Sequence, residues 1–118
     1  MIPWKLLDTA QVPGGTTELR LYQRDAEFSI RVDRAELMNS RVYASEDAFS
    51  EVGCARIEGR KNARVLIGGL GMGYSLKTAL DRLPKDSTVV VAELVAAVVK
   101  WNREWLGHLA DHPLRDAR

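Results

Sequence analysis

Three glycines at alternate positions carry the clearest chemical signal in the sequence. Gly69, Gly71 and Gly73 lie in the segment Val-Leu-Ile-Gly-Gly-Leu-Gly-Met-Gly, which ends at residue 73. Because glycine has no Cβ, such a turn can adopt backbone angles closed to other residues and lets a ligand approach the main chain closely. A helix that starts at this turn directs free N–H groups and a partial positive charge at the ligand. The segment therefore predicts a binding turn.

An acidic residue follows the turn at the spacing that suits a nucleoside cofactor. Glu93 stands twenty residues after Gly73, directly after the apolar run 88–92. In open α/β sheets, an acid at the end of the second strand accepts hydrogen bonds from ribose hydroxyls. We therefore predict that Glu93 binds the ribose of an adenine-containing cofactor. The alternative is a tight strand-to-helix connection that binds no ligand.

The segments around these residues predict an α/β unit that would hold them in place. Residues 63–67, apolar except for Arg64, are typical of a buried strand, and residues 74–83 have apolar side chains at helical spacing. Residues 88–92 are nearly all β-branched, which indicates a strand covered on both faces and hence a parallel sheet. Residues 94–106 predict a second helix, with Gly107 as its C-cap.

The N-terminal part of the chain has a different periodicity. Apolar and polar residues alternate in 17–23 and 27–33, which predicts a β-hairpin, and a third short strand is expected near 36–38. Residues 1–16 read as a short apolar piece followed by a turn-rich stretch. From Ser45, an N-cap candidate, helical spacing predicts a short helix.

These patterns divide the chain into two regions. Residues 1–58 form an N-terminal β-hairpin region with a short helix, and residues 59–118 form a partial Rossmann-like cofactor-binding domain of strand, helix, strand and helix. Two parallel strands do not complete such a domain, because the second strand would keep an open edge. We therefore expect a truncated chain that stops just before a third strand, or an edge that another chain supplies.

Composition narrows the classes of function. The chain has 118 residues, of which 46% are hydrophobic, and a net charge of only +1. Basic and acidic residues are interleaved, so no nucleic-acid footprint is expected. No apolar run approaches the roughly 18 residues of a membrane span. Cys54 is the single cysteine, which excludes an internal disulfide and favours a reducing cytoplasm; we expect it to fill the core.

The glycine turn and the acid resemble the motifs of a known family. Residues 65–74 are similar to the first motif of spermidine synthases and their methyltransferase-like relatives, and residues 91–94 resemble the second motif, whose acid holds the cofactor ribose. The resemblance covers residues 17–107. It implies a class I methyltransferase-type fold behind a small β domain. It also implies S-adenosylmethionine, or its decarboxylated form, as cofactor and a dimer as a common state.

The sequence departs from the polyamine-making members of this family at two places. Met72 stands where those members carry an acid inside the glycine turn. Ala44, Ser45 and Glu46 stand where they carry Tyr-His-Glu, so the tyrosine and histidine are missing. These departures argue against an aminopropyl transferase and favour a relative with another substrate, or with none. The acids that the family uses for proton removal would lie beyond residue 118.

Two other pairs of side chains could serve a ligand. Trp101 and Trp105 are four residues apart on the predicted second helix, and we expect them to pack in the core rather than to stack on a ligand. His108 and His112 have a spacing that can bind a metal on a helix. Gly107 makes a regular helix there doubtful, and no third ligand is evident, so no metal site is predicted.

The leading hypothesis is therefore a spermidine-synthase-like, S-adenosylmethionine-binding protein of the methyltransferase type, present as a partial chain without a complete active site. A full-length parent would be a transferase, and no catalytic residue is assigned to this chain. The expected cofactor-binding residues are Gly69, Leu70, Gly71, Gly73, Glu93 and Leu94.

Two alternatives remain open. The first is a non-catalytic module that associates with a copy of itself through strand pairing or domain swapping. The second is a nicotinamide cofactor, which the sequence favours less because Tyr74 stands where the dinucleotide pattern has its third glycine.

Overall fold

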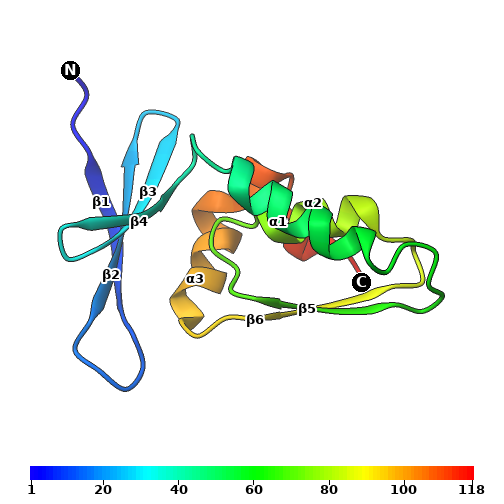
Figure 1. The fold of residues 1–118 in the computed structure, drawn as a ribbon. Coiled ribbons are helices and arrows are strands. Elements are labelled where there is room, and N and C mark those ends of the chain that lie inside the picture. The colour runs from blue at the N-terminus through cyan, green and yellow to red at the C-terminus, as the bar shows by residue number, and fades with distance from the viewer. The chain divides into compact units, whose positions relative to one another are not determined.

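The computed structural model describes residues 1–118 and forms two compact units, Met1–Tyr43 and Ala44–Arg118 (Figure 1). The first unit consists of β-strands, and the second combines helices with two parallel strands. The sequence prediction placed the boundary after residue 58. The helix α1 (Ala44–Ala55) instead belongs to the second unit, because it packs along the helix α2 (Tyr74–Arg82).

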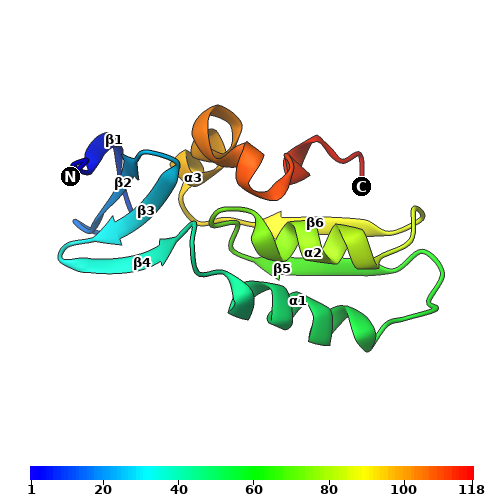
Figure 2. The same ribbon diagram turned by 90° about the horizontal axis from the view of Figure 1, so that it is seen from above.

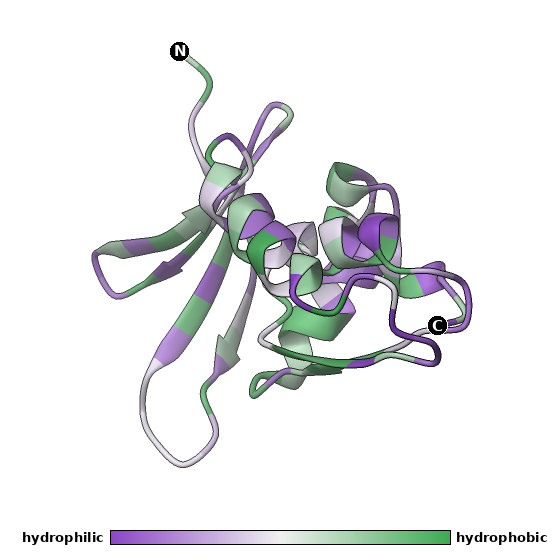
Figure 3. Ribbon diagram, turned by 45° about the vertical axis from the view of Figure 1, so that its right-hand side comes forward, coloured by the Kyte–Doolittle hydropathy of each residue, from purple (hydrophilic) through white to green (hydrophobic).

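The first unit is a four-stranded antiparallel sheet whose strands follow one another in sequence order. The strands are β1 (Lys5–Gln11), β2 (Glu18–Arg24), β3 (Glu27–Val32) and β4 (Ala35–Asn39). The predicted hairpin is confirmed as β2 and β3, and the third predicted strand as β4. Figure 3 shows the alternating hydrophilic and hydrophobic bands along these strands on which that prediction depended.

Strand β1 occupies a stretch for which the sequence predicted only an apolar piece and turns. Its pairing with β2 shifts register between Leu6 and Asp8. Such an irregularity interrupts the two-residue alternation by which a strand is recognised in a sequence. Trp4, which precedes the strand, lies under the guanidinium groups of Arg24 and Arg31, at 4.4 and 4.8 Å from the ring centre. These cation–π contacts help to fix the start of β1 on the sheet.

The second unit contains the predicted strand–helix–strand arrangement. Strands β5 (Arg64–Gly68) and β6 (Thr88–Ala92) pair in parallel, in a register that runs from Arg64 opposite Thr88 to Gly68 opposite Ala92. Helix α2 connects them. A parallel pair needs such a crossover, because the chain must return to the end of the sheet where the first strand began before it can form the second strand. The chain is therefore a mixed α/β protein.

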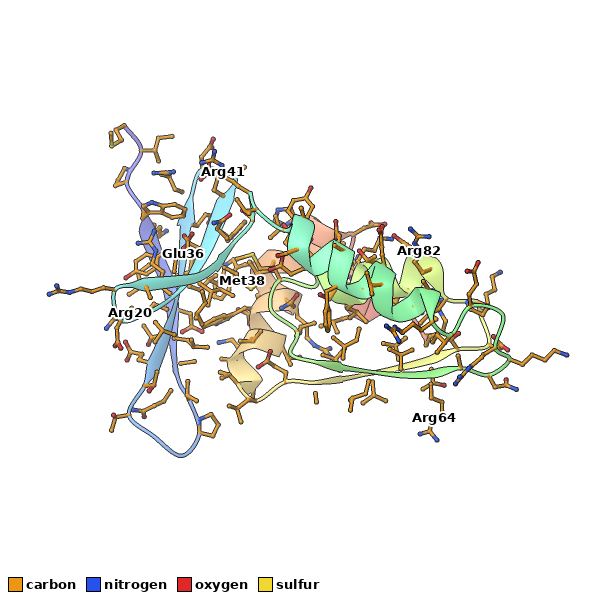
Figure 4. The ribbon with its side chains drawn as sticks, in the orientation of Figure 1. Arg20, Glu36, Met38, Arg41, Arg64 and Arg82 are labelled. Carbon is orange, nitrogen blue, oxygen red and sulfur yellow. The ribbon has the colours of Figure 1, made fainter.

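The helices α1 and α2 lie on one side of this two-stranded sheet (Figures 1 and 2). The other side is bare: Leu66 is 70% exposed and Val90, its neighbour on β6, is 50% exposed. Arg64, on the same face of β5, points away from the helices in Figure 4. The expectation that the 88–92 strand is covered on both faces is therefore wrong for this chain, since no element of the second unit covers the face opposite α2.

The predicted second helix begins and ends differently from the expectation. Helix α3 (Ala96–Trp101) continues as a π-helix over Asn102–Leu106 and as a 3₁₀ turn over Gly107–Ala110. Gly107 has a φ of −54°, in the right-handed helical region, so it is not a C-cap in the left-handed conformation. A Cβ on Gly107 would lie 2.5 Å from Nδ1 of His112, which explains the glycine by close packing. Asp111, with a φ of 56°, takes the left-handed position instead.

The C-terminal segment returns to the sheet after a 3₁₀ turn at Pro113–Arg115. The backbone N–H of Val89 donates to the carbonyl of Arg118 at 3.0 Å, and the Arg118 guanidinium donates to the carbonyl of Leu83 at 2.8 Å. These bonds hold the last residue beside β6. Among the helices, none combines the length and the apolar character needed to cross a membrane.

Candidate functional site

The glycine turn connects the end of β5 to the start of α2 and has the backbone that the sequence predicts. Gly69, Gly71 and Gly73 have φ values of 97°, 55° and 89°, all of which L side chains rarely adopt. The Gly69 N–H donates to the carbonyl of Ala92 at 2.7 Å, and the Gly73 N–H donates to the carbonyl of Leu70 at 2.9 Å. The first of these bonds joins the turn to the end of β6.

The structure brings Glu93 against this turn. Its Oε1 accepts a hydrogen bond from the Leu70 N–H, and its Oε2 accepts one from the Val95 N–H, both at 2.9 Å. A carboxylate offers about four lone-pair sites, so these two bonds leave acceptor capacity on both oxygens. The half-buried side chain is thus fixed in orientation and still able to accept from a pair of hydroxyls. It also ties the turn to the start of α3.

The two leucines predicted at the site differ in their environment. Leu70 is only 5% exposed, so its side chain belongs to the core and only its main chain faces the turn. Leu94 is 68% exposed and directly follows Glu93. The structure therefore leaves Leu94, but not the Leu70 side chain, open to a ligand.

One residue of the site was not predicted from the sequence. Asn102, at the junction of α3 and the π-helix, is 3% exposed and lies behind the turn. Its Nδ2 donates to the carbonyl of Gly71 at 2.7 Å and to the carbonyl of Val98 at 2.9 Å. The sequence does contain a signal for it, since Asn102 is an amide on a helical face that Val98 and Leu106 make apolar. That signal does not say what the amide contacts.

A cavity of about 250 Å³ adjoins the site along β6. Apolar side chains such as Leu76, Val89 and Val91 line it together with Glu93. Sites for drug-sized molecules measure about 300–1,000 Å³, so this cavity lies just below that range.

The other candidates from the sequence lie apart from this site or in the core. Trp101 is fully buried, which confirms its assignment to the core, and Trp105 is half-buried. Cys54 is also buried, and burial raises the pKa of its thiol. His108 and His112 gather no further ligands, because no group of three or more His, Cys, Asp or Glu side chains is placed to hold a metal ion.

Comparison of the sequence with protein-family models and with curated proteins found no match.

Proposed function

We propose that this chain binds S-adenosylmethionine and supplies the first half of a Rossmann-like, methyltransferase-type fold related to spermidine synthases. One observation carries the proposal: a glycine turn with three positive φ angles and a glutamate carboxylate meet at the carboxyl ends of two parallel strands. Ligands of open α/β sheets bind at this end of the strands. The decarboxylated cofactor would make the same adenosyl contacts.

Each residue has a defined part in this proposal. The free acceptor sites of Glu93 bind the 2′- and 3′-hydroxyls of the ribose, and the exposed Leu94 packs on the adenine. Gly69, Gly71 and Gly73 let the main chain pass close beneath the amino-acid end of the ligand. When bound, the cofactor would supply an electrophilic methyl group, whose transfer depends mainly on positioning against the acceptor. The absence of Tyr-His at residues 44–45 disfavours a polyamine acceptor.

Calorimetric titration with S-adenosylhomocysteine, the stable product form, tests the proposal. We expect Glu93→Ala to weaken binding at least tenfold, or about 1.4 kcal/mol, because charge-assisted hydrogen bonds to the ribose are lost. Glu104→Ala is the matched control, since Glu104 is exposed on the π-helix. Wild-type chain that shows no binding at saturating ligand would contradict the proposal.

A change in the ligand separates ribose binding from folding. Glu93 also holds the N–H groups of Leu70 and Val95, so its removal disturbs the turn itself. The 2′-deoxy analogue of the same ligand leaves the protein intact. We expect wild-type chain to bind the analogue more weakly than the parent ligand, and Glu93→Ala to bind both equally. Equal binding of both ligands by wild type would contradict the proposed hydrogen bond between Glu93 and the 2′-hydroxyl.

A second candidate function is self-association, which a separate observation favours. Strand β5 pairs only with β6, and beside its open edge a cavity of about 730 Å³ is lined by α1 and β5. Phe49 and Val52 on α1 are 72% and 63% exposed, and Leu66 on β5 is 70% exposed. We infer that a second copy of the chain covers this apolar surface, because open strand edges and contiguous apolar patches mark association sites.

A further inference from the structure

We infer that Asn102 is a positioning residue that holds the glycine turn in its left-handed conformation; its effect on ligand affinity rests on the proposed function, but its effect on the turn does not. Asn102 comes from a different element, more than thirty residues along the chain, and its Nδ2 reaches the carbonyl of Gly71 at the centre of the turn. It thus fixes one peptide group in a segment where glycines give the main chain its greatest freedom.

The contacts require a carboxamide. Two carbonyl oxygens, of Gly71 and Val98, converge on the same nitrogen at 2.7 and 2.9 Å. Only a group with two N–H bonds on one atom can donate to both, and the pair of acceptors fixes the orientation of the amide. An aspartate has the same shape but would place a carboxylate against two carbonyl oxygens. The site therefore discriminates between two nearly isosteric side chains.

The other end of the amide also lies against the turn. A Cβ on Gly73 would lie 3.4 Å from Oδ1 of Asn102 and 3.0 Å from Cγ of Pro113. The side chain of Asn102 therefore spans the rear of the turn from Gly71 to Gly73. Any residue other than glycine at position 73 would press against the side chains of Asn102 and Pro113 and would also have to adopt an unfavourable φ of 89°.

The energetics indicate a role beyond core packing. Oδ1 of Asn102 is buried and accepts no hydrogen bond. An unsatisfied buried acceptor costs about 1–3 kcal/mol, and an apolar residue of similar size would avoid that cost. The polar group is nevertheless placed where the helix changes from α to π, a distortion that recurs at functional sites. The hydrogen bond to the Gly71 carbonyl is the contact that accounts for an amide at this position.

Amide hydrogen exchange tests the inference directly. The N–H groups of Gly69, Leu70 and Gly73 are all hydrogen-bonded in the turn and serve as reporters. In Asn102→Asp, and in the smaller uncharged Asn102→Ser, we expect these amides to exchange at least tenfold faster after correction for the change in global stability. Val98→Ala is the control, because it removes core packing from the same helix and keeps the turn's hydrogen bonds.

Ligand affinity gives a second readout. We expect Asn102→Ser to lose at least tenfold in affinity for S-adenosylhomocysteine and much less for adenosine, since only the larger ligand extends over the turn. Turn amides in both Asn102 variants that change no more than those in Val98→Ala would overturn the inference. If wild type binds neither ligand, the proposed function fails, whereas the exchange rates still decide the role of Asn102.

Discussion

Glu93 has a structural role in the turn and, in the proposed function, a second role toward the ligand. Its two oxygens each accept a main-chain N–H, from Leu70 before the crossover helix and from Val95 before the next helix. A carboxylate that accepts such bonds is already oriented before a ligand binds, which reduces the entropic cost of binding. The same bonds make Glu93 necessary to the turn, so its substitution alone cannot separate the two roles. For this reason the 2′-deoxy analogue of the ligand, which leaves the protein unchanged, gives the sharper test.

The backbone of the turn can be tested at two neighbouring glycines. A Cβ on Gly68 or on Gly69 would meet no atom within 4 Å, but only Gly69 has a positive φ, of 97°. We expect Gly69→Ala to lower the free energy of unfolding by about 1–2 kcal/mol, because the alanine is held in a left-handed conformation. Gly68→Ala should leave it unchanged or raise it slightly. Equal effects in urea denaturation would show that the turn relaxes to another conformation.

The sequence identifies some residues of the site and not others, for a physical reason. Gly69, Gly71, Gly73 and Glu93 belong to a pattern of fixed spacing, because strand, turn and helix have characteristic lengths. Asn102 belongs to no such pattern, since its contact with Gly71 depends on how the helix that follows β6 packs against the turn. A spacing rule can find residues that lie on consecutive elements. It cannot find a residue that reaches the turn from the side.

At the scale of elements, the β3–β4 hairpin contains a carboxylate that can be titrated. Hydrogen bonds from Ser29 Oγ and from Asn39 Nδ2, with the nearby charge of Arg31, lower the pKa of Glu36 on β4 (Figure 4). A pKa that is lower in the folded state means that the ionised form favours folding. This contribution is complete above the pKa of the unfolded chain and is lost as the pH falls through the lower folded value.

Acid titration of two variants checks this prediction. We expect the free energy of unfolding of wild type to fall between pH 6 and pH 3 more steeply than that of Glu36→Gln, which cannot ionise at this position. Glu58→Gln is the control, because Glu58 is an exposed glutamate outside the first unit. An NMR titration of the Glu36 side chain should give a pKa below that of a free glutamate. A steeper fall in Glu36→Gln would reverse the sign and contradict the prediction.

The elements that the sequence predicts well are those whose local pattern is regular. Strands β5 and β6 are nearly continuous apolar runs, helix α2 repeats its apolar positions at helical spacing, and the structure contains all three within a residue of the predicted bounds. Strand β1 and the C-terminal end of the second helix lack this regularity. A register shift interrupts β1. The helix changes from α to π geometry at Asn102 and continues as a 3₁₀ turn past Gly107. Both deviations depend on contacts between elements, which local pattern does not encode.

At the scale of the molecule, the second unit exposes an apolar surface on and beside its two-stranded sheet. Parallel strands are covered on both faces in nearly all known folds. Here Leu66 and Val90 lie side by side on a face that no element of the second unit covers, and Phe49 and Val52 add to the apolar surface beside the β5 edge. These four apolar side chains offer on the order of 400 Å² per copy, about half of the area per partner in a standard-sized interface.

Sedimentation velocity over a range of concentrations tests whether a second copy supplies that cover. We expect wild type to form a dimer and Leu66→Asn to weaken it at least tenfold, or about 1.4 kcal/mol, because the substitution places an amide in an apolar contact. Leu37→Asn is the control, since Leu37 is 61% exposed but lies on β4 in the first unit.

The glycine turn is at the ends of β5 and β6, whereas Leu66 is in the middle of β5. Leu66→Asn should therefore change the assembly and leave the affinity for the adenosyl ligand intact. Wild type that stays monomeric at every concentration, or a dimer that both variants keep, would exclude this surface as the site of self-association.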